Sequence, residues 1–221
     1  MKKQCRSTTG EVLFEYEGLL LDAVNQFLYN TCWGEFSEER DQLPHFSLDL
    51  SQATKEDKHL EGFDGICQDL RGSNFSGTDL YWSAFREANL ENINFSHCDL
   101  RGASFNNAIL INANFENANM SFANIGGGAD LAGANLTGAN LQNVNLNGTQ
   151  YDSKTIFPEG FIVPECMILR RDDESDQEFS KRAKEIKTKH YEEHGHPLGC
   201  PCLQCVPSPQ NVESNTKINE K

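Results

Sequence analysis

A large apolar or aromatic residue returns every five positions along the middle of the chain, seventeen times in succession with one interval of six. The series is Leu70, Phe75, Leu80, Phe85, Leu90, Phe95, Leu100, Phe105, Leu110, Phe115, Met120, Ile125, Leu131, Leu136, Leu141, Leu146 and Tyr151. A period of five fits neither the 3.6 residues of a helical turn nor the alternation of a flat strand. Internal repetition therefore decides the architecture before any local propensity does.

Each unit of the repeat has the same distribution of large, small and polar residues. Two positions before the central residue the side chain is almost always small, and one position before it the residue is usually Asn or Asp. Residues two apart on an extended chain point to the same side, so the large and small residues face inward and the intervening one faces water. Polar turn formers such as Asn92, Gly102 and Asn112 suit a chain that bends after every unit. The pattern predicts a parallel solenoid whose coils stack on one another.

Several segments resemble a known family. SNFSGTDL, ANLENINF, ANFENANM and ADLAGANLTGANLQNVNL resemble the pentapeptide repeat family, whose pattern is A(D/N)LXX, and YDSKTIFPEGF resembles the ending common after its cyanobacterial members. The resemblance implies an all-β solenoid, namely a right-handed four-sided parallel β-helix with four pentapeptides per coil and about four coils in this chain. Residues twenty apart would then form walls in which columns of Phe oppose each other between columns of Leu.

Two further features of the repeat carry structural predictions. The interval of six falls at Gly126–Gly128, where we expect a bulge at a corner because Gly accepts the dihedral angles that an extra residue imposes. A binding loop is the alternative. Asn74, Asn94, Asn114 and Asn135 occupy equivalent outward positions, and we expect them to stack as a structural amide ladder.

The flanks of the repeat divide the chain into four parts. We predict a helical or capping N-terminal region over residues 1–59, the β-helix over 60–152, a C-terminal cap over 153–171 and a charged, largely disordered tail rich in Cys and His over 172–221. Apolar residues at helical spacing predict a helix that closes the N-terminal end of the rod, or that binds a partner or dimerises. They are Leu13, Tyr16, Leu20, Val24 and Phe27.

Shorter apolar patterns predict the remaining elements of the flanks. The alternation of Phe46, Leu48 and Leu50 predicts a short strand before the repeats. A cluster after the repeats predicts an apolar plug over the C-terminal end; its members are Ile156, Phe157, Phe161, Ile162 and Val163. Beyond Arg171 a thin stripe predicts a frayed helix before the disordered tail, and its members are Phe179, Ala183 and Ile186.

Charge and hydropathy limit the classes of partner. The chain of 221 residues carries 33 acidic and 19 basic side chains, a formal net charge of -14, which argues against binding nucleic acid through a basic surface and leaves a protein partner. No apolar run approaches the ~20 residues needed to span a bilayer. Acidic residues occupy the N-terminal stretch where a signal peptide would be apolar, so we expect a soluble, cytoplasmic protein.

The cysteines indicate one candidate metal site. Eight cysteines without an export signal favour reduced thiols or a metal over disulfides. Six ligand-type residues lie close together near the C-terminus: His190, His194, His196, Cys200, Cys202 and Cys205. The three cysteines and one histidine could supply the four ligands of Zn²⁺, although the spacing lacks paired CxxC motifs. Reduced thiols in a flexible tail, and an intermolecular disulfide or redox sensing, are the alternatives, and no other cofactor is expected. Cys98 occupies a small inward position and belongs to the core.

The repeat leaves the function to its outward residues. Carboxylates point outward from a convex rod with no predicted cleft, and no phosphate loop or nucleophile elbow is present, so we do not expect an enzyme. Trp82 and Phe122 occupy equivalent outward positions with Gly102 between them, and Tyr81 adjoins Trp82. This pattern predicts an exposed aromatic patch for a protein partner, or a surface covered by the terminal segments.

A second apolar surface patch is smaller. Ile109 and Ile111 replace the polar residues expected on one side of the rod, which makes them further candidates for binding a partner.

Three functional hypotheses follow. The first is a non-enzymatic interaction or scaffold protein, whose partner the sequence does not name; a homodimer is one option. The second, taken from the resemblance, is an acidic DNA mimic that binds a topoisomerase such as DNA gyrase. It ranks lower because Asp79 and Asp99 are followed in their column by Asn119 and Asn140. The third is a metal- or redox-responsive regulator that uses the Cys/His-rich tail.

Overall fold

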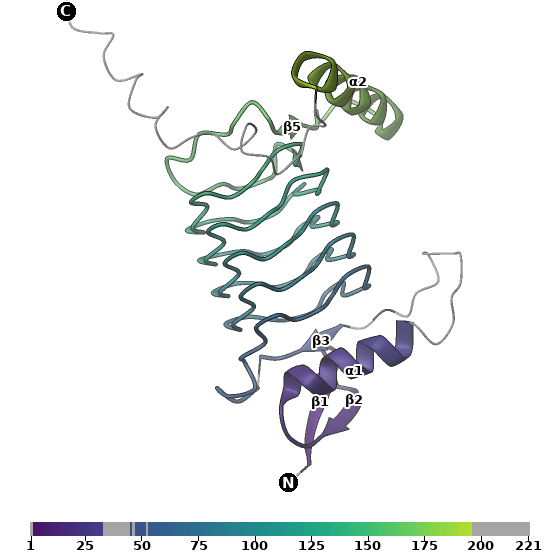
Figure 1. Ribbon diagram of the computed structural model, residues 1–221, viewed down its shortest axis with the longest axis vertical. Coiled ribbons are helices and arrows are strands. Elements are labelled where there is room, and N and C mark those ends of the chain that lie inside the picture. Colours follow the sequence, from purple (N-terminus) through teal and green to yellow (C-terminus); the bar gives the residue numbers. More distant parts are fainter. Residues whose placement is uncertain (1, 33–44, 46, 52, 196–221) are drawn as a thin grey trace, which may run out of the picture.

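The computed structural model describes residues 2–32, 45, 47–51 and 53–195, and stacked coils form a rod at its centre (Figure 1). The regular elements are β1 (Lys3–Ser7), β2 (Val12–Tyr16), α1 (Leu20–Cys32), β3 (Leu48–Asp49), β4 (Gln150–Tyr151), β5 (Ile168–Leu169) and α2 (Asp176–His194). The N-terminal elements lie at one end of the rod and α2 lies at the other.

The coils are held together by single parallel bridges between residues twenty apart. The first full coil of bridges pairs His59 with Asp79, Asp64 with Ala84, Asp69 with Asn89 and Asn74 with Asn94. Four bridges per twenty residues make a four-sided rod. Each side contributes one bridged residue between two turns, which is why the rod contains few extended strands. The predicted β-helix solenoid is confirmed.

Two columns of Phe fill the first coils of the rod, as predicted. The rings of Phe75, Phe95 and Phe115 follow one another at centroid distances of 5.7 and 5.5 Å. On the opposite wall Phe85 and Phe105 stack at 5.1 Å, and Phe85 meets Phe95 edge-on at 5.3 Å. Offset and edge-on rings exclude water and pack densely, so the five rings form a continuous apolar interior.

The glycine run is a bulge, as predicted. Before it Ser104 pairs with Asn124, twenty residues on, whereas after it Ile109 pairs with Asp130, twenty-one residues on. Gly127 and Gly128 absorb the extra residue with φ angles of 79° and 116°. Glycine adopts these angles without strain, whereas a side chain at the second angle would be strained. The rod therefore passes through the bulge without loss of its bridges.

The coils begin before the rhythm of large residues does. In the unit before that of Leu70, the central position holds Gly65, and Phe63 stands at the position that is small in other units. A Cβ on Gly65 would lie 2.9 Å from ring atoms of both Phe63 and Phe85. The ring of Phe63 therefore fills the space that a large residue at position 65 would occupy. Because the large and small residues are exchanged in this unit, the five-residue pattern does not indicate this coil.

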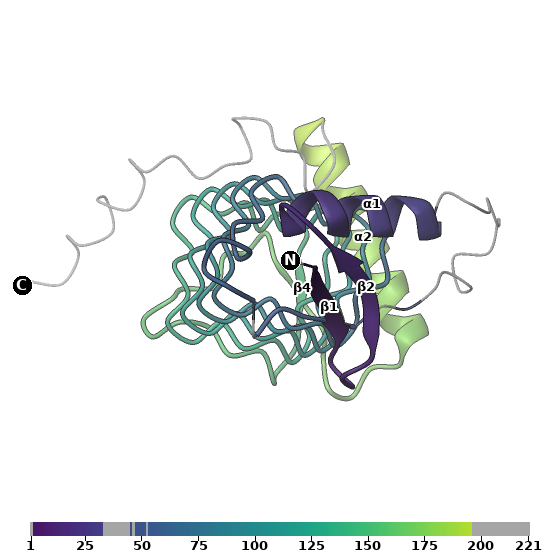
Figure 2. The same ribbon diagram turned by 90° about the horizontal axis from the view of Figure 1, so that it is seen from below.

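The N-terminal helix begins later than predicted. The helical spacing places Leu13 and Tyr16 in that helix, but they belong to β2, which forms an antiparallel hairpin with β1 around Gly10. The prediction is wrong for these two residues because Gly18, with a φ of 90°, separates the strand from the helix. Helix α1 then buries Leu20 and Val24 of the predicted stripe together with Leu28. Figure 2 shows that α1 and the hairpin lie across the end of the rod.

The strand predicted around Leu48 joins the hairpin to the rod. β3 pairs with β1, so the sheet order is β2-β1-β3, and Asp49 also forms a bridge to Asn74 in the coils. Phe46 lies outside the described residues.

The C-terminal plug forms from only part of the predicted cluster. Phe157 stacks on Phe161 at 5.3 Å and meets Tyr151 at 5.6 Å. Ile162 is 88% exposed and Ile156 is also exposed, so the prediction is wrong for both. Ile156 points outward because it forms the bridge above Asn135, a position whose side chain faces water in every coil.

Helix α2 is a capped helix and is not frayed. Ser175 and Glu178 form a capping box at its start, and Gly195 ends it in the left-handed conformation with a φ of 74°. Phe179 and Ala183 of the predicted stripe are buried against Ile168. Residues 196–221 lie outside the described part of the chain.

Within the described ranges, no helix is both long enough and apolar enough to cross a membrane.

Candidate functional site

Tyr81, Trp82 and Phe122 lie on one corner of the rod, which we call the aromatic corner. Trp82 donates its backbone N–H to Arg101 in the next coil at 3.0 Å, and Gly102 likewise donates to Ser121 at 3.1 Å. Trp82, Gly102 and Phe122 thus occupy the same position in three consecutive coils. Trp82 is 65% exposed and Phe122 is 66% exposed, so no described terminal segment covers them.

The indole of Trp82 rests on a glycine. A Cβ on Gly102 would lie 3.3 Å from two atoms of the Trp82 ring, so the ring packs against the Gly102 backbone and leaves its other face to solvent. Tyr81 meets Trp82 edge-on at a centroid distance of 6.0 Å. The Arg101 guanidinium lies 5.2 Å from the Tyr81 ring centroid. These contacts hold two aromatic rings in place before any partner arrives.

The exposed aromatic residues stand at strained backbone positions. Trp82 has a φ of 57° and Phe122 a φ of 61°, in the left-handed region. The same corner position in the other coils holds Gly62, Gly102 and Asn143, residue types that accept this conformation. A bulky residue there costs roughly 1–2 kcal/mol. Because the side chains remain exposed, burial within the chain does not offset this cost.

The side of the rod next to the aromatic corner is only partly acidic. Arg101 binds both oxygens of Asp99, at 2.8 and 3.0 Å, and this hydrogen bonding raises the pKa of the guanidinium. Asp79 faces His59 at 3.4 Å. The next two residues of the column, Asn119 and Asn140, are neutral and joined amide to amide at 3.1 Å. The column therefore carries no continuous negative charge.

The second apolar patch lies on the opposite side of the rod. Ile109 forms bridges to Asn89 and Asp130, in the column two sides away from that of Asp79. Ile109 is 42% exposed, and Ile111 is half-buried. The structure therefore separates the five candidate residues into two surfaces. Three of them share the aromatic corner, and Ile109 and Ile111 form the second apolar patch.

The predicted amide ladder is present. The side-chain amide of Asn94 donates to Asn74 at 3.1 Å, that of Asn114 donates to Asn94 at 3.4 Å, and that of Asn135 donates to Asn114 at 3.3 Å. Asn74 in turn donates to Asp49 at 3.3 Å, which extends the ladder into β3. The ladder spans the coils and belongs to the framework of the rod.

The described cysteines differ in exposure. Cys98 is buried, as predicted, and its thiol donates to the carbonyl of Phe75 at 3.0 Å; burial raises its pKa. Burial also raises the pKa of Cys5 to about 12. Cys67 is exposed. Since the thiolate is the reactive form, Cys5 and Cys98 are inert in the folded chain.

The predicted zinc cluster is left untested. Cys200, Cys202, Cys205 and His196 lie outside the described residues, and so does the side chain of His194. His190 lies in α2. Over the ranges that the structure describes, no three His, Cys, Asp or Glu side chains are grouped to hold a metal ion. Zinc binding by the tail remains a prediction.

One feature beside α2 was not predicted. A groove of about 620 Å³ runs along the helix and includes Lys184, Lys187 and Tyr191. The sequence in this region predicts a charged tail and no groove. The spacing of these residues on one helical face is the signal that could have indicated a shared surface.

Comparison with known families agrees with the coils. Residues 69–92, 93–128 and 127–150 match the family described as pentapeptide repeats, in eight copies. Residues 69–150 are therefore a run of pentapeptide repeats. The matched segments include Tyr81, Trp82 and Phe122, so the aromatic corner lies within the repeats. Among curated proteins, none matches the chain.

Solved structures include similar repeat proteins. A pentapeptide repeat protein of the Arabidopsis thaliana thylakoid lumen is 28% identical over 43% of this chain and 59% of its own, with a TM-score of 0.28. Rfr23, from the cyanobacterium Cyanothece 51142, is 37% identical over 43% of this chain and 64% of its own, with a TM-score of 0.22. QnrB1, a plasmid-mediated fluoroquinolone resistance protein, is 18% identical over 56% of this chain and 84% of its own, with a TM-score of 0.24. The chain spans less than two thirds of the length of the first two proteins.

Proposed function

We propose that this protein is a non-enzymatic interaction or scaffold protein whose β-helix presents the aromatic corner to a protein partner. The observation that carries the proposal is that Trp82 and Phe122 are 65% and 66% exposed at left-handed positions where Gly or Asn would be less strained. Residues that break a local rule without a gain in packing are expected at functional sites. Pentapeptide repeat proteins are in general interaction or scaffold proteins, which supports the broader part of the proposal.

The energetics of association favour this surface. Trp and Phe each bury about 150–250 Å² in an interface, and at about 25 cal/mol per Å² a single ring supplies several kcal/mol before ordering costs. The contacts of Trp82 with Gly102 and of Tyr81 with Arg101 hold the rings in place. A surface that is ordered in advance loses less side-chain entropy on binding.

The charge of the rod does not favour the DNA-mimic alternative. Asp69 is paired with Arg71 at 2.7 Å and Asp99 with Arg101 at 2.6 Å, so basic side chains neutralise part of the acidic surface. A mimic of duplex DNA needs negative charge at regular intervals along the rod. We therefore do not propose topoisomerase binding for this chain.

Affinity capture with matched variants tests the proposal. The intact chain and the variant Trp82→Asn/Phe122→Asn are immobilised and exposed to an extract of the source cells, and captured proteins are identified by mass spectrometry. Asn fits the backbone because Asn143 occupies the same corner position with a φ of 57°. We expect the double variant to lose the partner, with at least a tenfold weaker Kd once the partner is purified.

The control variant changes the opposite side of the rod. Ile109→Asn also replaces an exposed apolar residue by Asn, and Asn89 occupies its position in the adjacent coil. We expect this variant to retain the partner. Equal capture by the wild type and Trp82→Asn/Phe122→Asn would refute the proposal, and loss with Ile109→Asn alone would assign binding to the other surface.

A further inference from the structure

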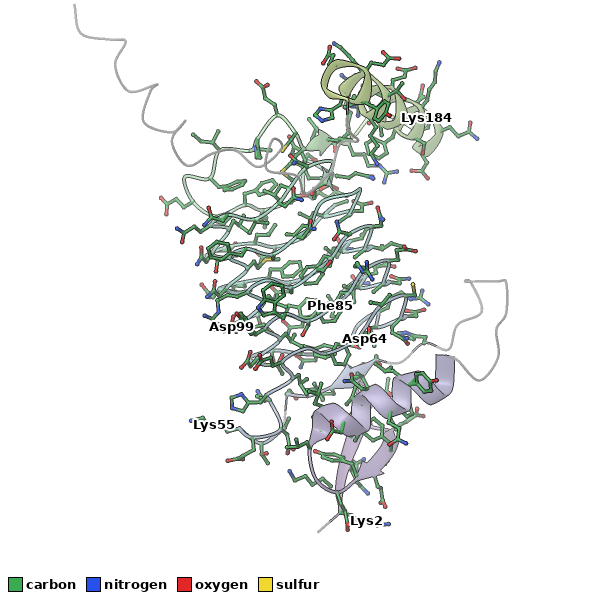
Figure 3. The ribbon with its side chains drawn as sticks, viewed as in Figure 1. Lys2, Lys55, Asp64, Phe85, Asp99 and Lys184 are labelled. Carbon is green, nitrogen blue, oxygen red and sulfur yellow. The ribbon has the colours of Figure 1, made fainter. Side chains whose placement is uncertain are left out.

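The groove beside α2 has a volume in the range of small-molecule sites. Its volume is about 620 Å³, and one face of α2, from Phe179 to Tyr191, lines it together with Gln150 of β4. Ligand pockets commonly measure about 300–1,000 Å³. Figure 1 shows α2 beside the end of the coils, and Figure 3 labels Lys184 on this helix.

The polar side chains that line the groove are suited to an anion. Lys184 and Lys187 contribute ammonium groups, Ser180 and Thr188 contribute hydroxyl groups, and Gln150 contributes an amide. Among the residues that the structure describes, no carboxylate lines the groove. The acidic residues of α2 lie on its other faces; they are Asp176, Glu178, Glu185, Glu192 and Glu193. In a chain with a net charge of -14, a groove with two ammonium groups and no carboxylate attracts anions selectively.

The glycine bulge gives one of these ammonium groups its place. A Cβ on Gly128 would lie 3.1 Å from Nζ of Lys187, so the absence of a side chain at Gly128 lets the lysine lie against the rod. Lys187 is half-buried in this position. Neither Lys184 nor Lys187 forms an ion pair with any other described residue. Their charge is therefore available to a ligand.

The groove also has apolar walls. Phe179 and Ala183 line it as buried side chains, and Tyr191 is exposed near the end of the helix. The guanidinium groups of Arg170 and Arg182 lie 5.1 and 5.6 Å from the ring centroid of Phe179 and help to fix the position of the ring. Apolar lining beside two ammonium groups matches a ligand that has an apolar body and a charged end.

We propose that this groove binds a small organic anion, in which an aromatic or aliphatic body packs on Ala183 and Tyr191 and a carboxylate or phosphate group binds Lys184 and Lys187. The site is independent of the aromatic corner. The occupant we propose is a small molecule, because the volume of about 620 Å³ lies within the range of small-molecule pockets.

The binding test uses the intact chain and 1-anilinonaphthalene-8-sulfonate, a fluorescent aromatic anion. We expect a saturable fluorescence increase with the wild type and about tenfold weaker binding with Lys184→Gln/Lys187→Gln. Lys181→Gln/Lys189→Gln removes the same charge from the same helix outside the groove and should bind as the wild type does. Circular dichroism checks that each variant keeps its helix.

Competition distinguishes the sources of the anion. Phenyl phosphate and phenylacetate should displace the dye, and the tighter of the two identifies the charged group, whereas benzyl alcohol should not displace it. Equal dye binding by both double variants would overturn the proposal, and so would displacement by benzyl alcohol. Displacement by a hexaglutamate peptide at lower concentrations than either small anion would assign the groove to an acidic protein segment and would also overturn it.

Discussion

Gly65 should be among the least replaceable residues of the rod, although no left-handed angle requires glycine there. In Gly65→Ala the new methyl group would lie 2.9 Å from Cε1 of Phe63 and 2.9 Å from Cδ1 of Phe85. Real Cβ atoms essentially never approach other atoms so closely. Both rings are fully buried between neighbouring rings, so neither can move aside without displacing others.

The magnitude follows from the packing. Overpacking of a dense core by one methyl group costs about 1–3 kcal/mol. The reduced entropy of the unfolded chain when Gly becomes Ala returns about 0.4–1 kcal/mol. We therefore expect Gly65→Ala to lower the free energy of unfolding by about 1–2 kcal/mol.

A double-mutant cycle isolates the exchange between positions 63 and 65. Phe63→Ala alone should cost about 3–5 kcal/mol, because it leaves a cavity beside a glycine. The combination Phe63→Ala/Gly65→Leu restores the order of small and large residues that Ser83 and Phe85 show one coil later. It should recover at least about 1.5 kcal/mol of that loss through coupling of the two sites.

Urea unfolding followed by circular dichroism measures Gly65→Ala and the three variants of the cycle, which are Phe63→Ala, Gly65→Leu and Phe63→Ala/Gly65→Leu. The reasoning is refuted if Gly65→Ala changes the free energy of unfolding by less than about 0.5 kcal/mol, which is the range of neutral surface changes. It is equally refuted if the double variant is destabilised by the sum of the single changes, because the two sites would then not share one space.

Three further outcomes are expected. Trp82→Asn should leave the free energy of unfolding unchanged or raise it by about 1 kcal/mol, because Asn tolerates the left-handed angle, and a clear loss in urea unfolding would show that Trp82 stabilises the rod. Hydrogen bonding from Arg182 lowers the pKa of Glu174 from 4.5 to about 2, so the ion pair stabilises α2 above pH 4.5 and is lost as the pH falls toward 2. The difference in melting temperature between the wild type and Glu174→Gln should shrink across that window, and a constant difference would contradict the assignment. In alkylation at pH 8, read peptide by peptide in a mass spectrometer, Cys67 should react and Cys5, whose pKa burial raises to about 12, should not; rapid labelling of Cys5 would mean that the N-terminal elements open.

The sequence predicted the rod well because its interactions are local and repeated. The inward direction of Cys98, the amide ladder through Asn94 and the bulge at Gly126–Gly128 all follow from counting in fives. It also placed Trp82 and Phe122 in one outward column. Each of these features depends only on a residue's position within its own unit.

The errors arose where the repeat ends. Helical spacing from Leu13 to Phe27 is compatible with a strand followed by a helix, and only the pairing of β1 with β2 and β3 separates the two. The exposure of Ile162 depends on how the chain folds back after the last coil. Apolar residues in irregular segments have no period from which a direction can be assigned.

The sequence by itself determined the solenoid, its register and the outward direction of the aromatic corner, because a repeated unit of five residues specifies the same backbone path each time. Only the tertiary structure decided the exchange of Phe63 and Gly65, the flat packing of Trp82 on Gly102 and the approach of Lys187 to Gly128. In each of these cases one residue occupies space that another leaves empty. Such complementarity joins residues across coils or across the whole chain, and no periodic pattern along the sequence records it.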